Sequence, residues 1–209
     1  MLSIIVRLDI IFEAISFFIS LAIFAVALAA ARRTGSRSLT LLALGFLLMS
    51  LAMFIRVALT SWALNFPMTT PPRLRIFPTV VLQIQELVYS VVRISGYVVF
   101  LYLYSSYTSS KKEGEGLFAV APLIIYNPLF EAVSALLLAF VVYQLGKNRM
   151  YGGSVYVLLG FVLLLLSHLL FLLLPLSITI YFLAQFTQLL SLILFLTAVL
   201  SVLLDGQRL

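Results

Sequence analysis

The chain has 209 residues, of which 64% are hydrophobic and 10% are charged, and its formal net charge is +6. Soluble globular domains contain about 45–50% apolar and about 25% charged residues, so this composition excludes an ordinary water-soluble domain. The lack of cysteine excludes disulfides and thiolate metal sites, and the basic charge, which lies mostly in loops, suits anionic lipid headgroups rather than nucleic acid.

Six apolar stretches are long enough to cross a bilayer as helices, which requires roughly 20 residues each. In chain order they are residues 9–31, 38–63, 78–107, 119–146, 151–174 and 177–204. The last two belong to one long apolar run that is divided at Pro175, because proline lacks an amide hydrogen and disfavours helical geometry at Leu174. The first stretch has full spanning length, so no signal peptide is predicted. Lipid tolerates only helices or closed barrels, and no strand alternation is seen, so we predict an all-α, multi-pass membrane protein.

The second half of the chain repeats features of the first half. The phrase "DIIFEAIS" parallels "NPLFEAVS", which pairs Glu13 with Glu131. Further along, each half has a basic turn followed by a Leu-Gly-Phe helix, which places Gly45 opposite Gly160. We interpret these matches as an internal repeat, and a chance likeness between leucine-rich helices is the alternative.

The repeat divides the chain into two three-helix units, residues 1–108 and 119–209, joined by a polar linker, residues 109–118. Because each unit has an odd number of spans, the second is predicted to be inverted relative to the first, as in inverted-repeat transporters. Loop lysines and arginines divide almost evenly between the two sides of the membrane. The dense basic loop "RRTGSR" favours an N-terminus outside the cell membrane.

Glu13 and Glu131 allow two interpretations. Asp9 and Asn127 are good N-caps and Pro128 suits a first helical position, so both acids would lie near a helix start, close to headgroups or water. In the alternative, the fourth helix starts earlier and is kinked at Pro128, which places Glu131 near the bilayer midplane as a functional carboxylate. We favour the first interpretation, because two copies of one N-cap pattern are easier to explain as helix starts.

A polar face on the third predicted helix is the clearest functional signal. Its members recur three, four or seven residues apart, and they are Gln83, Glu86, Ser90, Arg93, Tyr97 and Tyr104. Charged groups cost about 2.5–3.5 kcal/mol each at the centre of a membrane helix, so they face the interior and pair. We predict that Arg56 on the second helix pairs with Glu86. Arg93 would be bound by Glu13 or Glu131, by tyrosine hydroxyls or by backbone carbonyls.

The second unit carries fewer charges. Its polar set consists of His168 on the fifth predicted helix and Gln185, Gln188 and Ser191 on the sixth. Glutamines three residues apart can hydrogen-bond between helices, whereas His168 is either a histidine bonded to a neighbouring helix or a proton relay. One histidine and no cysteine exclude a bis-histidine haem and argue against zinc, so no cofactor or metal is predicted. Hydrolase, P-loop and dinucleotide motifs are absent from the sequence, and no enzyme is predicted.

The block "ARRTGSRSLTLLALGFLLMSLA", residues 31–52, resembles small archaeal three-helix membrane proteins of uncharacterised function. The resemblance covers residues 14–107, and the second half looks like a divergent second copy. It implies an archaeal membrane protein but no activity, ligand or site residue. Arg56, Glu86 and Arg93 lie outside the resembling block.

Two functions are compatible with these features. The first is a small transporter or channel that uses polar residues at the interface between the units. Its candidate binding or transport residues are Arg93, Glu86, Arg56, Glu131, Glu13, Gln83, Gln185, Gln188 and His168. The alternative is a non-catalytic subunit or sensory module of a larger membrane assembly, in which the ion pairs only fix helix packing. The predicted partners are membrane lipids, other membrane subunits or further copies of the chain.

Overall fold

The structure is a computed structural model that describes residues 2–65, 76–106, 127–148, 155–174 and 177–205. Six α-helices make up almost all of this part: α1 (Leu2–Thr34), α2 (Arg37–Leu64), α3 (Ile76–Ser106), α4 (Asn127–Asn148), α5 (Val155–Leu172) and α6 (Ile178–Asp205). All six are long and apolar enough to cross a membrane. The prediction of an all-α chain with six helices able to span a membrane is confirmed for the described residues, whereas the predicted linker 109–118 lies outside them.

The turn between α1 and α2 shows how the sequence sets one helix boundary. Gly35 has a φ of 66°, a left-handed conformation that glycine adopts without a Cβ clash, and its amide donates to Ala31 O at 2.9 Å. Ser36 is the N-cap of α2, and its hydroxyl accepts a hydrogen bond from the Leu39 amide at 3.4 Å. This short connection makes α1 and α2 antiparallel neighbours.

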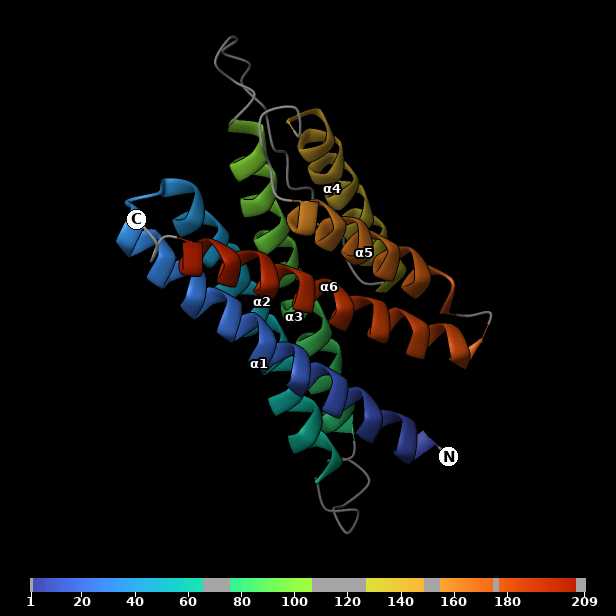
Figure 1. The fold of residues 1–209 in the computed structure, drawn as a ribbon. Coiled ribbons are helices and arrows are strands. Elements are labelled where there is room, and N and C mark those ends of the chain that lie inside the picture. Colours follow the sequence, from blue (N-terminus) through green and yellow to red (C-terminus); the bar gives the residue numbers. More distant parts are fainter. Residues whose placement is uncertain (1, 66–75, 107–126, 149–154, 175–176, 206–209) are drawn as a thin grey trace.

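The helices form a closed ring, in which each helix packs against the next and α6 packs against α1 (Figure 1). Consecutive helices within α1–α3 and within α4–α6 are antiparallel. In contrast, α1 and α6 run in the same direction. Asp9 near the start of α1 contacts Tyr181 near the start of α6, and Phe12 packs on Phe186 with ring centroids 5.3 Å apart.

Helices α3 and α4 also run in the same direction, because each is antiparallel to α5. On α3, Tyr97 contacts His168, and the following Tyr104 packs on the earlier Phe161 of α5. On α4, Glu131 near the helix start contacts His168 near the end of α5. The first and second units therefore have equivalent helices that point the same way.

The predicted inversion of the second unit is not seen in the described helices. The predicted inversion assumed that the connection between the two units does not cross the membrane. That connection, residues 107–126, lies outside the described part of the chain. The direction of α4 follows instead from its contacts with α3 and α5, which the span count did not contain.

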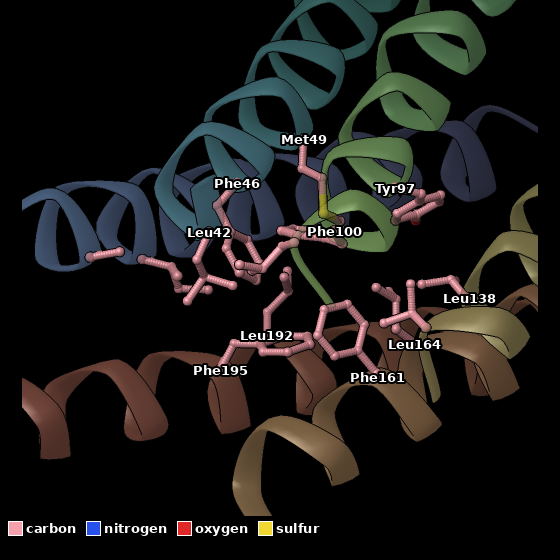
Figure 2. Close-up of a cluster of buried hydrophobic side chains, with 14 of the residues drawn as sticks. Leu42, Phe46, Met49, Tyr97, Phe100, Leu138, Phe161, Leu164, Leu192 and Phe195 are labelled. Atoms are coloured by element: carbon pink, nitrogen blue, oxygen red, sulfur yellow. The ribbon is translucent and has the colours of Figure 1, made fainter. Parts of the chain in front are cut away.

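Four phenylalanine rings at the centre of the core come from equivalent positions in the two units (Figure 2). Phe46 packs on Phe100 with centroids 5.1 Å apart, and Phe161 packs on Phe195 at 4.6 Å. Across the units, Phe46 lies 5.0 Å from Phe195 and Phe100 lies 5.2 Å from Phe161. The Phe46–Phe100 contact of the first unit therefore corresponds to the Phe161–Phe195 contact of the second, and the two contacts between the units correspond to each other.

Large apolar side chains are exposed on the outer faces of all six helices. Phe18, Phe54, Tyr143 and Phe186 are among the most exposed of them. Such surface is unfavourable in water and favourable in hydrocarbon, which suggests that the outer face contacts lipid.

Candidate functional site

Polar and charged side chains from all six helices form one group inside the apolar ring. We call it the central polar network, and its members are Asp9 and Glu13 of α1, Arg56 of α2, Tyr89, Arg93 and Tyr97 of α3, Glu131 of α4, His168 of α5, and Tyr181 and Gln185 of α6. Buried charges are tolerated only where partners compensate their lost hydration, so the network is organised around two arginines.

Arg56 is held by two acids of α1. Its guanidinium donates from Nη1 to Glu13 Oε1 at 3.0 Å and from Nη2 to Asp9 Oδ2 at 3.4 Å. Asp9 and Glu13 are four residues apart and therefore lie on the same helix face. Asp9 also accepts hydrogen bonds from the Tyr181 hydroxyl and from Gln185 Nε2, the latter at 3.4 Å. This half of the network joins α1, α2 and α6.

The predicted pair of Arg56 with Glu86 is wrong. Among the described residues, the ion pairs of Arg56 are with Asp9 and Glu13, and Glu86 on α3 is half-buried without an ion pair. The favoured reading of Glu13 as a helix-start acid is also wrong, because α1 begins at Leu2 and Glu13 lies within it, 1% exposed. A longer α1 brings both acids to the level of Arg56.

Arg93 is held by residues of α3 and α4. Nη1 donates to the Tyr89 hydroxyl at 2.9 Å, and Nη2 donates to Glu131 Oε1. Of the partners predicted for Arg93, which were Glu13 or Glu131, tyrosine hydroxyls or backbone carbonyls, the structure shows Glu131 and one tyrosine hydroxyl. Glu131 is the fifth residue of α4, as the helix-start interpretation predicts, and it lies against the middle of α3. Helix α4 therefore begins deep in the bundle.

His168 extends this second half of the network to α5. Its Nδ1 contacts Glu131 Oε2, and its Nε2 lies 2.6 Å from the Tyr97 hydroxyl. With an ionised Glu131, the contacts assign the proton to Nδ1, which donates to the carboxylate, and Nε2 then accepts from Tyr97. His168 is 1% exposed. The arrangement fixes the ring in one tautomer between a hydroxyl and a carboxylate.

Tyr89 connects the two halves and was not recognised in the sequence. The guanidinium carbon of Arg56 lies 4.9 Å from the centre of its ring, and that of Arg93 lies 4.7 Å away. Both distances are within the cation–π range. Positions 85, 89, 93 and 97 are spaced by four residues and are all buried, so this spacing is the signal that identifies Tyr89.

The remaining predicted residues divide between the interior and the surface. Gln83 is exposed, and its place inside is taken by Gln85, whose Nε2 lies 3.0 Å from the Thr60 hydroxyl. Gln185 and Gln188 are buried, as predicted for interior polar groups of α6. Gln185 belongs to the central polar network through Asp9 and Tyr181.

Several buried polar atoms have no hydrogen-bond partner among the described residues. They are Glu13 Oε2, Ser16 Oγ, Arg93 Nε, Ser134 Oγ and Gln185 Oε1. Such atoms are uncommon in protein interiors because leaving them unpaired costs about 1–3 kcal/mol each. The same part of the chain contains no group of three or more His, Cys, Asp or Glu side chains placed to hold a metal ion.

Comparisons with protein-family models, curated proteins and solved structures find no match to this chain. The resemblance of residues 31–52 to archaeal three-helix membrane proteins therefore stays a prediction.

Proposed function

We propose that the protein is a small membrane transporter that moves protons through the central polar network. The observation that carries the proposal is that each of the six helices supplies a side chain to this network. Ionisable groups inside membrane proteins are rare and mark ion and substrate pathways. A network to which all six helices contribute is larger than the neutralisation of a single buried arginine requires.

The contacts of His168 support proton transfer. The Tyr97 hydroxyl can pass its proton to Nε2 as it takes up another proton from the aqueous side, which makes the ring an imidazolium, and the Nδ1 proton can then pass to Glu131 Oε2. The ring is then neutral with its proton on Nε2, and one proton has moved from the Tyr97 side to Glu131; a flip of the ring restores the starting tautomer. No bond other than N–H and O–H is made or broken. Glu131 then holds a proton beside Arg93, which weakens that ion pair.

The place of the ion pairs supports a transport cycle. We interpret α1–α3 and α4–α6 as duplicated units in the same orientation, because their phenylalanine contacts are equivalent. Arg93 and Glu131 bridge α3 and α4, while Asp9 and Tyr181 bridge α1 and α6. These are two polar contacts between the units, which are also joined by Tyr97 with His168 and by the phenylalanine contacts of the core. Protonation of the acids would loosen both contacts and let the units move apart.

Proton flux into proteoliposomes tests this function. Vesicles loaded with a pH-sensitive dye are studied under a potassium diffusion potential and then under sodium and chloride gradients. The wild-type protein is expected to change the internal pH faster than protein-free vesicles, and Glu131→Gln is expected to remove that difference. Arg33→Ala, at the exposed end of α1, is the control and retains the wild-type rate. Wild-type flux equal to that of empty vesicles under every gradient would refute the proposal.

A non-catalytic subunit or sensory module is the second candidate, and one observation favours it. Arg56, Arg93, Glu131 and His168 all have partners in the folded chain. Paired charges of this kind also hold helices in register without any transport role. Purification in mild detergent distinguishes the two: a subunit retains a stoichiometric partner protein, whereas a transporter is active as the purified chain.

A further inference from the structure

Three buried oxygen atoms between α1 and α6 have unused acceptor capacity. Glu13 Oε2, Ser16 Oγ and Gln185 Oε1 have no hydrogen-bond partner among the described residues, and the three residues are 0–1% exposed. All three atoms are hard oxygen acceptors, from a carboxylate, a hydroxyl and an amide. The transport role proposed above uses Glu131 and His168 for the proton and leaves these oxygens without a task.

The packing of α1 against α6 places Gln185 beside the face of α1 that carries Asp9, Glu13 and Ser16. Gln185 Nε2 donates to Asp9 one turn before Glu13, and the ring of Phe12 packs against Phe186. Ser16 follows Glu13 by three residues and therefore lies on the same face of α1. The amide of Gln185 has a fixed orientation, because Nε2 also lies 3.0 Å from the Tyr181 hydroxyl. Its oxygen is therefore the free end.

The charge around these oxygens is negative. Asp9 and Glu13 share the single guanidinium of Arg56. Glu86 of α3 interacts electrostatically with Glu13 and Arg56 and has no ion pair of its own among the described residues. Arg93 also interacts electrostatically with Glu13, but it is already paired with Glu131, so four carboxylates lie near two arginines in this part of the network. The Arg93 half differs, because Glu131 opposes one arginine and a histidine.

We propose that a monovalent metal cation, with Na⁺ as the probe, binds between α1 and α6 at Glu13 Oε2, Ser16 Oγ and Gln185 Oε1. Carboxylate, hydroxyl and amide oxygens are the ligands that hard cations prefer. One positive charge offsets part of the acidic excess, and the nearby guanidinium of Arg56 disfavours a divalent ion. The binding of this cation does not depend on the transport function proposed above. Its role as the ion that is exchanged for the proton does rest on that function.

Thermal unfolding of the purified full-length chain in detergent tests the binding. NaCl is titrated against choline chloride at constant ionic strength and pH. A ligand that binds only the folded state raises Tm in a saturable way, so Na⁺ is expected to raise Tm by several degrees relative to choline. Equal effects of the two salts would overturn the proposal, as would a Tm that depends on pH but not on Na⁺, since a proton would then occupy Glu13.

Two variants on α1 form a matched pair. Ser16→Ala removes one proposed ligand and leaves the Arg56 ion pairs in place, and we expect Na⁺ to bind roughly tenfold more weakly, about the 1.4 kcal/mol of one lost ligand. Ser20→Ala is the control, because Ser20 is equally buried and its hydroxyl contacts the Met53 sulfur at 3.7 Å. Glu13→Gln should abolish the Na⁺ effect, and Ser16→Ala alone decides if that variant does not fold. Unchanged Na⁺ binding in Ser16→Ala would refute the site.

The binding experiment and the flux experiment fail separately. Na⁺ binding without proton flux leaves the cation site standing and refutes transport. Proton flux without Na⁺ binding refutes the cation site and leaves transport standing.

Discussion

Arg93 of α3 donates a charged hydrogen bond to Glu131 of α4, and this contact joins the two three-helix units near the middle of α3. Glu131 uses its second oxygen to hold His168 of α5. One carboxylate thereby fixes three helices, and both of its oxygens are committed. A buried side chain with this many partners is a sensitive position for mutation.

We expect Glu131→Gln to destabilise the protein by about 3–5 kcal/mol, the range found when one partner of a buried ion pair is removed. The amide keeps the shape of the side chain but leaves the guanidinium of Arg93 without a counter-charge. Thermal unfolding in detergent measures the effect. Lys147→Gln is the control, because Lys147 is exposed at the end of α4 and should change stability by less than about 0.5 kcal/mol. Equal unfolding temperatures for the two variants would contradict the prediction.

Arg56 is expected to couple energetically to Glu13 and not to Glu86. Double-mutant cycles with Arg56→Gln, Glu13→Gln and Glu86→Gln measure this coupling from unfolding free energies. Residues in direct contact give interaction energies of about 0.5–3 kcal/mol, so the cycle with Glu13, at 3.0 Å, should fall in this range. The cycle with Glu86 should give less than half of that value. A larger coupling to Glu86 would mean that the ion pairs of Arg56 are misassigned.

The sequence was sufficient for the existence and order of the six helices, though not for all their boundaries, and for the inward position of Arg56 and Arg93. A bilayer requires long apolar helices, and it makes an unpaired arginine costly wherever the helix packs. Glu131 was therefore one of several partners predicted for Arg93, and the structure selects it. The partners of Arg56 could not be predicted in this way. They depend on where α1 begins and on how α1, α2 and α6 pack, and both are tertiary properties.

Helix direction was beyond the sequence for a related reason. An odd span count implies inversion only if the connection between the units returns to the side from which it left. The directions of α3 and α4 are given by contacts such as Tyr97 with His168, which join residues far apart in the chain. Tyr89 was missed because the predicted polar face passed through the neighbouring Ser90, whereas the Tyr89 ring lies 4.9 Å from the guanidinium carbon of Arg56 and 4.7 Å from that of Arg93.

Substitutions of Tyr89 are expected to have graded effects. Tyr89→Phe removes the hydroxyl that accepts from Arg93 and should cost about 1.5–3 kcal/mol, the value of a hydrogen bond to a charged group. Tyr89→Leu also removes the ring that faces both guanidinium groups and should cost about 0.5–2 kcal/mol more. Unfolding of both variants in the same detergent gives the two increments. Tyr143→Phe, at an exposed position of α4, is the control. Equal stability of the Phe and Leu variants would show that the ring has no cation–π role.

Gly45 and Gly160 are expected to tolerate no side chain, because each lies under a phenylalanine of the central core. A Cβ at Gly45 would lie 2.2 Å from Phe100 Cε1, and a Cβ at Gly160 would lie 2.9 Å from Phe195 Cζ. Both rings are fully buried within the phenylalanine cluster (Figure 2) and have little room to shift. Each Gly→Ala change should therefore cost about 1–3 kcal/mol through overpacking.

Gly146→Ala is the matched control for these two glycines. Gly146 lies in the last turn of α4, and an added Cβ there would meet nothing within 4 Å. Alanine has the better helix propensity, so this variant should gain up to about 1 kcal/mol. Each of the three variants adds one methyl group to a glycine. Unfolding temperatures measured side by side therefore isolate the effect of the phenylalanine ring above Gly45 and Gly160. The close approach of α2 to α3 and of α5 to α6 would be contradicted if Gly45→Ala or Gly160→Ala were as stable as Gly146→Ala. The larger loss should fall on Gly45, where the overlap with the ring is deeper and the neighbouring Gly96 holds α3 against the backbone of α2.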